Sequence, residues 1–299
     1  MRYLNRHTLG LGVSLLAIVI GVWGVHHVVS GHDRQTTTTK VTHTTTTASS
    51  TSTNAAATQR AAIQSKVQAY LTKVGADQTV SVTFKNLTPK AGSDAAKDPI
   101  YNTGSLTASV NGDIVETSAS TYKLFIAAYL FSHNYTWTDT AKTGFNNMVV
   151  NSANDFSEGI LAEYGASTID SYLTSQGWNN VFDDDRAAET TSNTLASVLT
   201  NLQAGTGAFS DSSLQSWLLS DMAKQVYRDG IPAAAGSGAT VQDKVGFLDD
   251  VNNDAAIVTM PNGARFILVI MTHGHNQATL DFSRINTIAK QVIKLAYGA

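Results

Sequence analysis

Cysteine is absent from the 299 residues of this chain, which excludes disulfides, a thiolate nucleophile and cysteine-ligated metal sites. The chain also lacks a repeat of about 20 to 50 residues, which argues against a solenoid. An excess of basic residues is missing too. The formal net charge is −3, and residues 1–58 carry +3 (four Lys and Arg against one Asp), so residues 59–299 carry −6. The acidic charge of residues 59–299, without a basic patch, argues against nucleic acid as a partner.

Asp, Glu, Lys and Arg are absent from residues 9–29, a run of 21 residues. A helix of that length spans about 31 Å, enough to cross the hydrocarbon core of a bilayer. Arg2 and Arg6 precede the run, so the positive-inside rule places residues 1–8 in the cytoplasm. We therefore expect a single-pass signal anchor in the cell membrane, with the rest of the chain extracytoplasmic. A signal peptide cleaved within residues 28–31 is the alternative.

Apolar residues are scarce in the next stretch, where 12 of residues 36–58 are Thr and three are Ser. Such a composition buries too little apolar surface to fold. Residues 30–58 are therefore predicted to form a disordered linker. The linker would hold a folded domain, residues 59–299, away from the membrane.

The hydrophobic pattern of the folded domain predicts strands near both of its ends and helices between them. Strands are expected at 79–87, 105–110, 244–248, 255–260 and 265–272. Helices are expected at 61–74, 118–130, 146–164, 167–175, 192–202, 214–227 and 280–295, with a loop over 88–99. This order favours an α+β domain, with terminal helices on one face of an antiparallel sheet and a helical subdomain between.

The first candidate for chemistry is Ser120. It lies where a helix is predicted to begin, and Lys123 follows three residues later, so the two side chains share one helix face. A serine hydroxyl is a weak nucleophile until a base takes its proton. A lysine whose pKa is lowered by its surroundings can be that base. Because Ser-x-x-Lys also occurs by chance, an ordinary helix N-cap is the alternative role for Ser120.

Two more short motifs follow in chain order: Ser-Ala-Asn at residues 152–154, and Lys-Val-Gly at residues 244–246, where a strand begins. Together with the Ser120 motif they resemble the S-x-x-K, S-D-N and K-T-G motifs of penicillin-binding proteins and class A β-lactamases. The resemblance covers about residues 60–299. It implies a β-lactamase/transpeptidase-like fold and a serine hydrolase that works through an acyl-enzyme, without a metal or another cofactor.

The resemblance also implies a role for each residue. Ser120 would attack a carbonyl carbon, and Lys123 would take the proton of its hydroxyl. Ser152 would relay a proton to the leaving nitrogen, helped by the second cation, Lys244. The side-chain amide of Asn154 would hold an amide of the substrate.

The same resemblance assigns the oxyanion site to the backbone N–H groups of Ser120 and Phe247. Gly246 would leave room for a substrate along the edge strand. The implied substrates are β-lactams or D-alanyl peptides of the cell wall. The membrane is the other expected contact, through residues 9–29, and the protein is expected to be monomeric.

The chain departs from the family pattern in two places. Val245 replaces a threonine whose hydroxyl helps to bind the substrate carboxylate, so that recognition is expected to be weakened or reassigned. The segment after Gly177 lacks the E-x-x-L-N pattern whose glutamate activates the deacylating water. Its acids are Glu189 and residues 183–185, which with Arg186 are expected to form a solvated turn or an ion pair. Acylation should therefore be possible, whereas rapid hydrolysis of the acyl-enzyme should be poor.

Three alternatives stay open on the sequence alone. The first is a catalytically weak member of the family that binds cell-wall peptide or a partner protein, which the Val245 change supports. The second is a metal pair at His273 and His275, on alternate residues of a strand, although a zinc site needs at least three protein ligands. The third is a Ser-His-Asp triad that uses one of these histidines or His133, without the usual sequence context.

Overall fold

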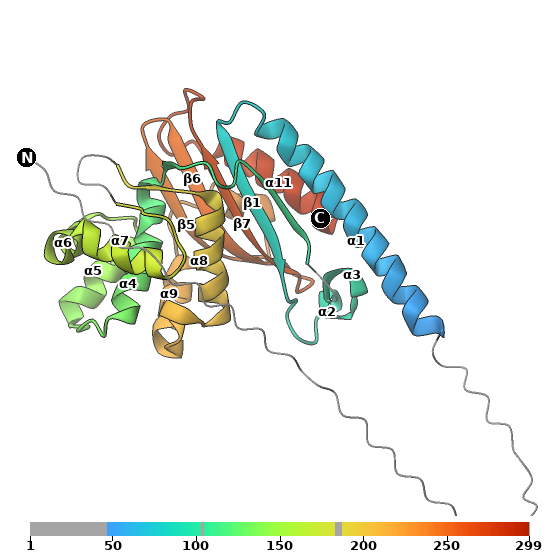
Figure 1. The fold of residues 1–299 in the computed structure, drawn as a ribbon, viewed down its shortest axis with the longest axis horizontal. Helices are drawn as coiled ribbons and strands as arrows, with labels where there is room; N and C mark the ends of the chain where they lie inside the picture. Colours follow the sequence, from blue (N-terminus) through green and yellow to red (C-terminus); the bar gives the residue numbers. More distant parts are fainter. Residues whose placement is uncertain (1–46, 103–104, 183–186, 299) are drawn as a thin grey trace, which may run out of the picture. The chain divides into compact units, whose positions relative to one another are not determined.

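The computed structural model describes residues 47–102, 105–182 and 187–298 (Figure 1). The predicted cytoplasmic tail, signal anchor and first part of the linker, residues 1–46, lie outside the described part of the chain. Among the residues that the structure describes, no helix is both long enough and apolar enough to cross a membrane.

The first helix begins earlier than the sequence pattern predicts. Helix α1 spans Thr47–Val74, so residues 47–58 are helical where the composition predicts a disordered linker. Three consecutive alanines at 55–57 explain the difference, because alanine has the highest helix propensity. Ala56 is also buried, so packing adds to that propensity.

A five-stranded antiparallel sheet lies at the centre of the domain, with its strands in the order β2-β1-β7-β6-β5 (Figure 1). The strands span Thr107–Val110 (β2), Val80–Leu87 (β1), Arg265–Thr272 (β7), Val251–Thr259 (β6) and Thr240–Leu248 (β5). The predicted antiparallel sheet is confirmed, although β5 and β6 each begin four residues before their predicted starts. Strand β5 is an edge strand, and its register pairs Gly246 with Asn253 of β6.

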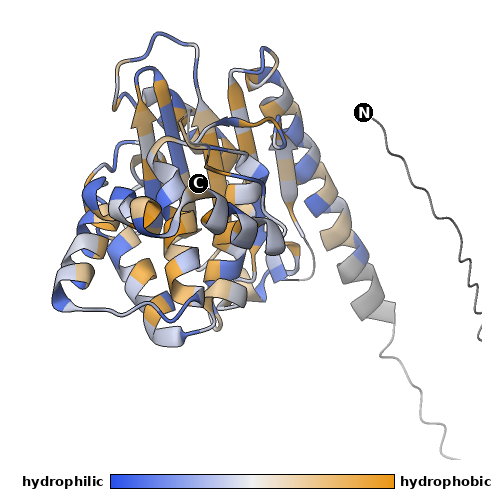
Figure 2. Ribbon diagram, turned by 60° about the vertical axis from the view of Figure 1, so that its left-hand side comes forward, coloured by the Kyte–Doolittle hydropathy of each residue, from blue (hydrophilic) through white to orange (hydrophobic). Residues whose placement is uncertain are grey.

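Helices cover both faces of this sheet. The even-numbered residues of β7 from Phe266 to Ile270 pack with α1 and α11 (Ser283–Tyr297). The odd-numbered residues from Ile267 to Met271 pack with α8 (Ser192–Ala204). Since successive side chains of a strand point to opposite faces, a strand covered on both sides is apolar along its whole length. In Figure 2 the orange of hydrophobic residues marks much of the central strands. The terminal helices α1 and α11 cover one face of the sheet, as predicted.

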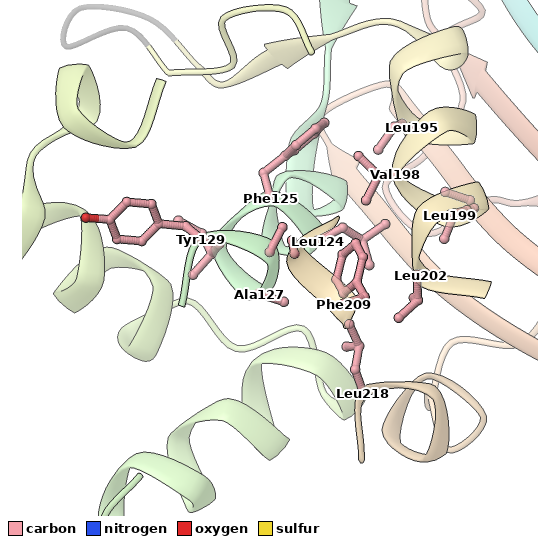
Figure 3. Packing of buried hydrophobic residues seen from close by; sticks show 14 of the residues in the cluster. Leu124, Phe125, Ala127, Tyr129, Leu195, Val198, Leu199, Leu202, Phe209 and Leu218 are labelled. Carbon is pink, nitrogen blue, oxygen red and sulfur yellow. The ribbon is translucent and has the colours of Figure 1, made fainter. Parts of the chain in front are cut away.

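The middle of the chain forms a helical subdomain around α4 (Lys123–Ser132). Nine of its ten residues are buried, since only Ser132 reaches the surface. A helix that is apolar on all sides must be surrounded. Figure 3 shows its side chains packed against α8, Phe209 and Leu218. The other helices of the subdomain are α5 (Asp139–Val150), α6 (Asp155–Tyr164), α7 (Ala166–Ser175) and α9 (Ser212–Met222).

Several predicted helices are divided or shortened in the structure. The helix predicted over 146–164 is two helices, α5 and α6, because the chain turns at residues 151–154, where Ser152 has a φ of +58°. The helix predicted over 118–130 begins with a 3-10 turn, η1 (Ala119–Tyr122), before α4. The helix predicted over 214–227 ends at Met222, and the predicted loop over 88–99 contains α2 (Asp94–Lys97) and the start of α3 (Pro99–Asn102). The first two breaks hold the candidate catalytic serines.

Candidate active site

Turn η1, which carries Ser120, packs backbone to backbone against β5. A Cβ atom built on Gly246 would lie 2.6 Å from the carbonyl oxygen of Ser118 and 2.9 Å from the backbone nitrogen of Ser120. Only glycine allows so close an approach. In the structure, the space where a Cβ of residue 246 would lie is occupied by the turn that carries the nucleophile. The expected room for a substrate along the edge strand stays a prediction.

The backbone at both candidate serines is strained. Ala119, which precedes Ser120, has a φ of +43°, and Ser152 has a φ of +58°. The left-handed region costs a residue with a Cβ about 1–2 kcal/mol, so such geometry persists only where neighbouring contacts impose it. The N–H and the hydroxyl of Ser118 both donate to the carbonyl oxygen of Ala188, at 2.8 and 2.9 Å. Asn253 adds bonds from its Nδ2 to the carbonyl oxygens just before Ala119.

Lys123 connects the first two motifs. Its Nζ donates to Ser120 Oγ at 2.8 Å, to the carbonyl oxygen of Ser152 at 2.7 Å and to Asn154 Oδ1 at 2.7 Å. The side chain is 1% exposed. Burial lowers the pKa of Lys123 to about 8, against a smaller opposing effect of the Glu158 charge. A lysine that loses its proton near this pH can accept the proton of the Ser120 hydroxyl.

Lys244 connects the second motif with the third. Its Nζ donates to Ser152 Oγ at 2.8 Å and to the carbonyl oxygen of Val245 at 2.9 Å. Lys244 is fully buried, and both burial and the nearby charge of Lys123 hold its pKa well below the ordinary lysine value. Ser152 is thus bonded to one lysine through its carbonyl oxygen and to the other through its hydroxyl. This arrangement allows the Ser152 hydroxyl to pass a proton.

Asn154 occupies the N-cap position of α6 without capping it. Its side chain makes no bond to the helix N-terminus, and its Oδ1 accepts from Lys123 instead. The residue is exposed, and its Nδ2 has no hydrogen-bond partner among the described residues. An amide held through its oxygen in this way presents its N–H donors to a ligand.

The structure therefore brings together five residues predicted for the site: Ser120, Lys123, Ser152, Asn154 and Lys244. The edge strand adds Gly246 and the partly exposed Phe247. The backbone N–H groups of Ser120 and Phe247 come from adjoining segments, and their oxyanion role stays a prediction.

The sequence did not reveal the buried residues that support the candidate catalytic residues. Arg228 Nη1 lies 2.8 Å from Asp243 Oδ1, so the residue before Lys244 is ion-paired. Asp254 accepts the N–H of Ile231 at 2.8 Å, and burial raises its pKa to about 7. Asn253, next to Asp254, is buried at the serine turn. Polar residues within the otherwise apolar run of a central strand were the available signal.

The segment that follows α7 brings an aromatic ring to the site. The N–H groups of Val181 and Phe182 donate to the Asp170 carboxylate at 2.9 and 3.2 Å. The Phe182 ring then meets Tyr122 edge to face, with 5.7 Å between centroids. Among the described residues, no carboxylate oxygen is hydrogen-bonded to Ser120 or Lys123. The predicted turn at residues 183–186 lies outside the described part of the chain.

Glu189 lines a different cleft. It lies in β4 (Glu189–Thr190), which pairs with β3 (Glu116–Thr117). The cleft has a volume of about 700 Å3, and Glu116 and His273 line it together with Glu189, whereas Ser120 and Lys123 do not.

The three histidines of the folded domain make other contacts. His273 Nδ1 lies 3.6 Å from Glu116 Oε2, and His275 Nε2 lies 2.9 Å from Thr79 Oγ1. His133 Nδ1 lies 2.7 Å from the carbonyl oxygen of Tyr129. No set of three His, Asp or Glu side chains in the described part of the chain is placed to hold a metal ion. The group bonded to the Ser120 hydroxyl is Lys123, so this geometry gives no support to a Ser-His-Asp triad.

Solved structures share this fold. PBP-A has 21% sequence identity and a TM-score of 0.61, over 79% of this chain and 94% of that one. A β-lactamase from Burkholderia phymatum has 14% identity and a TM-score of 0.64, over 79% and 99%. A PBP-A variant, described as an acyl-enzyme complex with penicillin G, has 22% identity and a TM-score of 0.60, over 80% and 96%. The fold is that of the β-lactamase-like serine hydrolases.

A match to a sequence profile identifies one family within this class. The profile of the beta-lactamase enzyme family matches residues 134–296, more than half of the chain, and the chain belongs to that family. No curated protein sequence matches this chain. The matched region contains Ser152 and Lys244, whereas Ser120 and Lys123 precede it and are joined to it through the bonds of the Lys123 ammonium group.

Proposed function

We propose that the protein is an extracytoplasmic serine hydrolase that forms an acyl-enzyme on Ser120, with β-lactams or D-alanyl cell-wall peptides as substrates. The observation that carries the proposal is the 2.8 Å bond between Lys123 Nζ and Ser120 Oγ, in a site that lowers the pKa of Lys123. Family membership supports the reaction class. The uncharged run at residues 9–29, after Arg2 and Arg6, supports the location.

Acylation follows from the hydrogen bonds of the site. Neutral Lys123 takes the proton of the Ser120 hydroxyl while Oγ attacks the carbonyl carbon, and the backbone N–H groups of Ser120 and Phe247 face the oxyanion that forms. When the tetrahedral intermediate collapses, the C–N bond breaks and the leaving nitrogen takes the proton of the Ser152 hydroxyl. The proton on Lys123 or Lys244 then restores that hydroxyl, which Lys244 holds at 2.8 Å.

Deacylation is proposed to be slow. Hydrolysis of the ester needs a base that activates water, and no carboxylate of the described residues is bonded to Ser120 or Lys123. The Phe182 ring, packed on Tyr122 beside Lys123, brings an apolar group to this side of the site. A PBP-A variant captured as an acyl-enzyme with penicillin G offers a parallel in the same fold.

The test is the time course of a chromogenic cephalosporin with the full-length protein. We expect a burst approaching one equivalent of product, followed by steady turnover at least about a hundredfold slower, the size of effect that one general base supplies. Equal burst and steady-state rates would overturn slow deacylation. Absence of both phases would favour the second candidate.

The second candidate is a catalytically weak module that binds cell-wall peptide or a partner protein. Val245 favours it, because this residue lacks the usual hydroxyl and is fully buried in an apolar cluster. The two buried lysines count against it. Burying two ammonium groups side by side is costly, and a binding module has no need of a lysine bonded to a serine hydroxyl.

A further inference from the structure

A cleft at the C-terminal end of α4, the end away from Ser120, is lined by aromatic and neutral polar side chains. It has a volume of about 650 Å3 and lies between the end of α4, the loop that follows it and residues 207–214. The rings of Phe131, Tyr135 and Trp137 line it, and the rings of Tyr135 and Trp137 meet edge to face with 4.9 Å between centroids. A concave, partly aromatic site of this size suits a small ligand. We call it the aromatic cleft.

Charge is scarce in the aromatic cleft. Among the described residues, Asp211 is the only charged one that lines it. The Oδ1 atom of Asp211 is already engaged, because it accepts the N–H groups of Ser213 and Leu214 at 2.8 and 3.0 Å and so caps α9. An anion would find no positive partner here, and a cation would find a single carboxylate that already caps a helix. The lining therefore favours an uncharged ligand.

The indole N–H of Trp137 has no partner within the protein. Trp178 Nε1 donates to Ser197 Oγ at 3.3 Å, and Trp217 Nε1 donates to Asn146 Oδ1 at 2.7 Å. Trp137, the third tryptophan of the described residues, makes no such bond among them, although its ring is half-buried and its Nε1 stays open to solvent. A half-buried ring with an unused N–H offers a ligand both an apolar surface and a hydrogen bond.

Neutral polar side chains lie beside the rings. Asn134, Ser210 and Ser213 line the aromatic cleft, are exposed and make no side-chain hydrogen bond to the described residues. A sugar has a matching surface, because the C–H groups of its ring form an apolar face and its hydroxyl groups lie around the edge. Aromatic rings beside unused amide and hydroxyl groups fit that pattern.

A lipid surface fits the aromatic cleft less well. Binding within a membrane interface relies on protruding apolar side chains and on Lys or Arg. The exposed large apolar side chains of the described residues are elsewhere, since none of them lines the cleft: Val115, Val226, Leu248 and Leu280. The rings of the cleft are themselves buried or half-buried.

We propose that the aromatic cleft is a binding site for an uncharged oligosaccharide. Along the axis of α4, about 14 Å separate Ser132 at the cleft from Lys123 at the active site. An extended peptide of about four or five residues covers this distance. A peptide joined to a cell-wall glycan is thus long enough to reach Ser120 while its sugar occupies the cleft. That link to a substrate rests on the proposed function, whereas sugar binding itself does not.

The test is calorimetric titration of the full-length protein with chitotetraose, an uncharged tetramer of N-acetylglucosamine. We expect saturable binding. Trp137→Phe keeps an aromatic ring but removes the indole N–H, so the affinity should fall by about threefold to tenfold, the effect of one neutral hydrogen bond. Ser213→Leu adds bulk inside the cleft and should weaken binding by at least about tenfold. Ser216→Leu is the matched control, because Ser216 is also exposed on α9 but does not line the cleft, and its affinity should be unchanged.

No saturable binding at millimolar sugar would overturn the inference, and so would equal binding by the native protein and Ser213→Leu. Self-association that Ser213→Leu abolishes, without sugar binding, would assign the cleft to a second copy of this chain and would also overturn it. Thermal unfolding checks that each variant is folded, and Ser213→Leu, a change at an exposed residue, decides the question if Trp137→Phe does not fold. Because sugar binding does not need Ser120, a missing penicillin adduct would refute the proposed function and leave this inference standing.

Discussion

Gly246 lies against Ser120 so closely that a Cβ on Gly246 would be 2.9 Å from the Ser120 backbone nitrogen. The glycine of the third motif therefore sets the distance between the edge strand and the nucleophile. This contact joins residues that are far apart in the sequence, and it fixes one of the N–H groups expected to face the oxyanion.

Replacing Gly246 by alanine should force η1 away from β5. We expect acylation of Ser120 to slow by at least about tenfold, because an oxyanion donor is displaced, and the free energy of unfolding to fall by about 1–3 kcal/mol through overpacking. Adduct formation by mass and chemical denaturation measure the two effects. Gly159→Ala is the matched control, because no atom lies within 4 Å of its added Cβ and the residue is within α6. That variant should keep full acylation, and equal losses in both variants would contradict a specific role of the contact between Gly246 and the Ser120 turn.

Acylation should rise with pH and level off above about 8. The base is the neutral form of Lys123, and burial lowers the pKa of this lysine to about 8, so raising the pH through that value increases the reactive fraction. At pH 7 about a tenth of Lys123 would be neutral. Acylation rates measured from pH 6 to 10 test this, and a flat profile would exclude Lys123 as the base. Lys123→Arg keeps the charge but cannot lose its proton, so acylation should fall by at least about a hundredfold.

Asn253 should affect the nucleophile without touching a substrate. Its Nδ2 donates to the carbonyl oxygens of Thr117 and Ser118 at 2.9 and 3.1 Å, and its Oδ1 accepts the N–H of Thr272 at 3.2 Å. Asn253→Ala removes these three bonds from the buried side of the serine turn, so we expect a loss of about 1–3 kcal/mol in the free energy of unfolding and slower acylation. Denaturant titration and adduct formation measure the two changes.

Asn252 is the control for this prediction. It is equally buried, but its side chain bonds to Ala278 and Leu280, which precede α11. Asn252→Ala should cost similar stability and leave the acylation rate of the folded protein unchanged. If both variants slow acylation equally, general loosening of the domain explains the effect, and Asn253 has no specific role in holding the serine turn.

The sequence predicts the fold well where apolar residues are periodic. The strands of the sheet, the terminal helices on one face and the buried helix after Ser120 all follow from that pattern. Prediction fails at the breaks: a helix predicted over 146–164 is interrupted at Ser152, whose positive φ is imposed by tertiary contacts. It fails also at residues 47–58, where alanine propensity and packing outweigh a polar composition.

Prediction of the candidate site also succeeded for some residues and failed for others. The motifs identified the residues that meet around Lys123, because their side-chain chemistry is visible in the sequence. The residues that support the site were not predicted. The ion pair of Arg228 with Asp243 and the bonds of Asn253 depend on strand register and on contacts between distant segments, which no local pattern encodes.

The role of Ser120 is tested by the intact mass of the full-length protein after incubation with a fluorescent penicillin, beside a Ser120→Ala variant. We expect a single stable adduct on the native protein that is absent from the variant, since Ser120 is the nucleophile and its ester is hydrolysed slowly. Consumption of the penicillin without an adduct would contradict slow deacylation. An adduct of equal yield on Ser120→Ala, or neither adduct nor consumption, would contradict the assignment of Ser120 as the nucleophile of a penicillin-reactive enzyme.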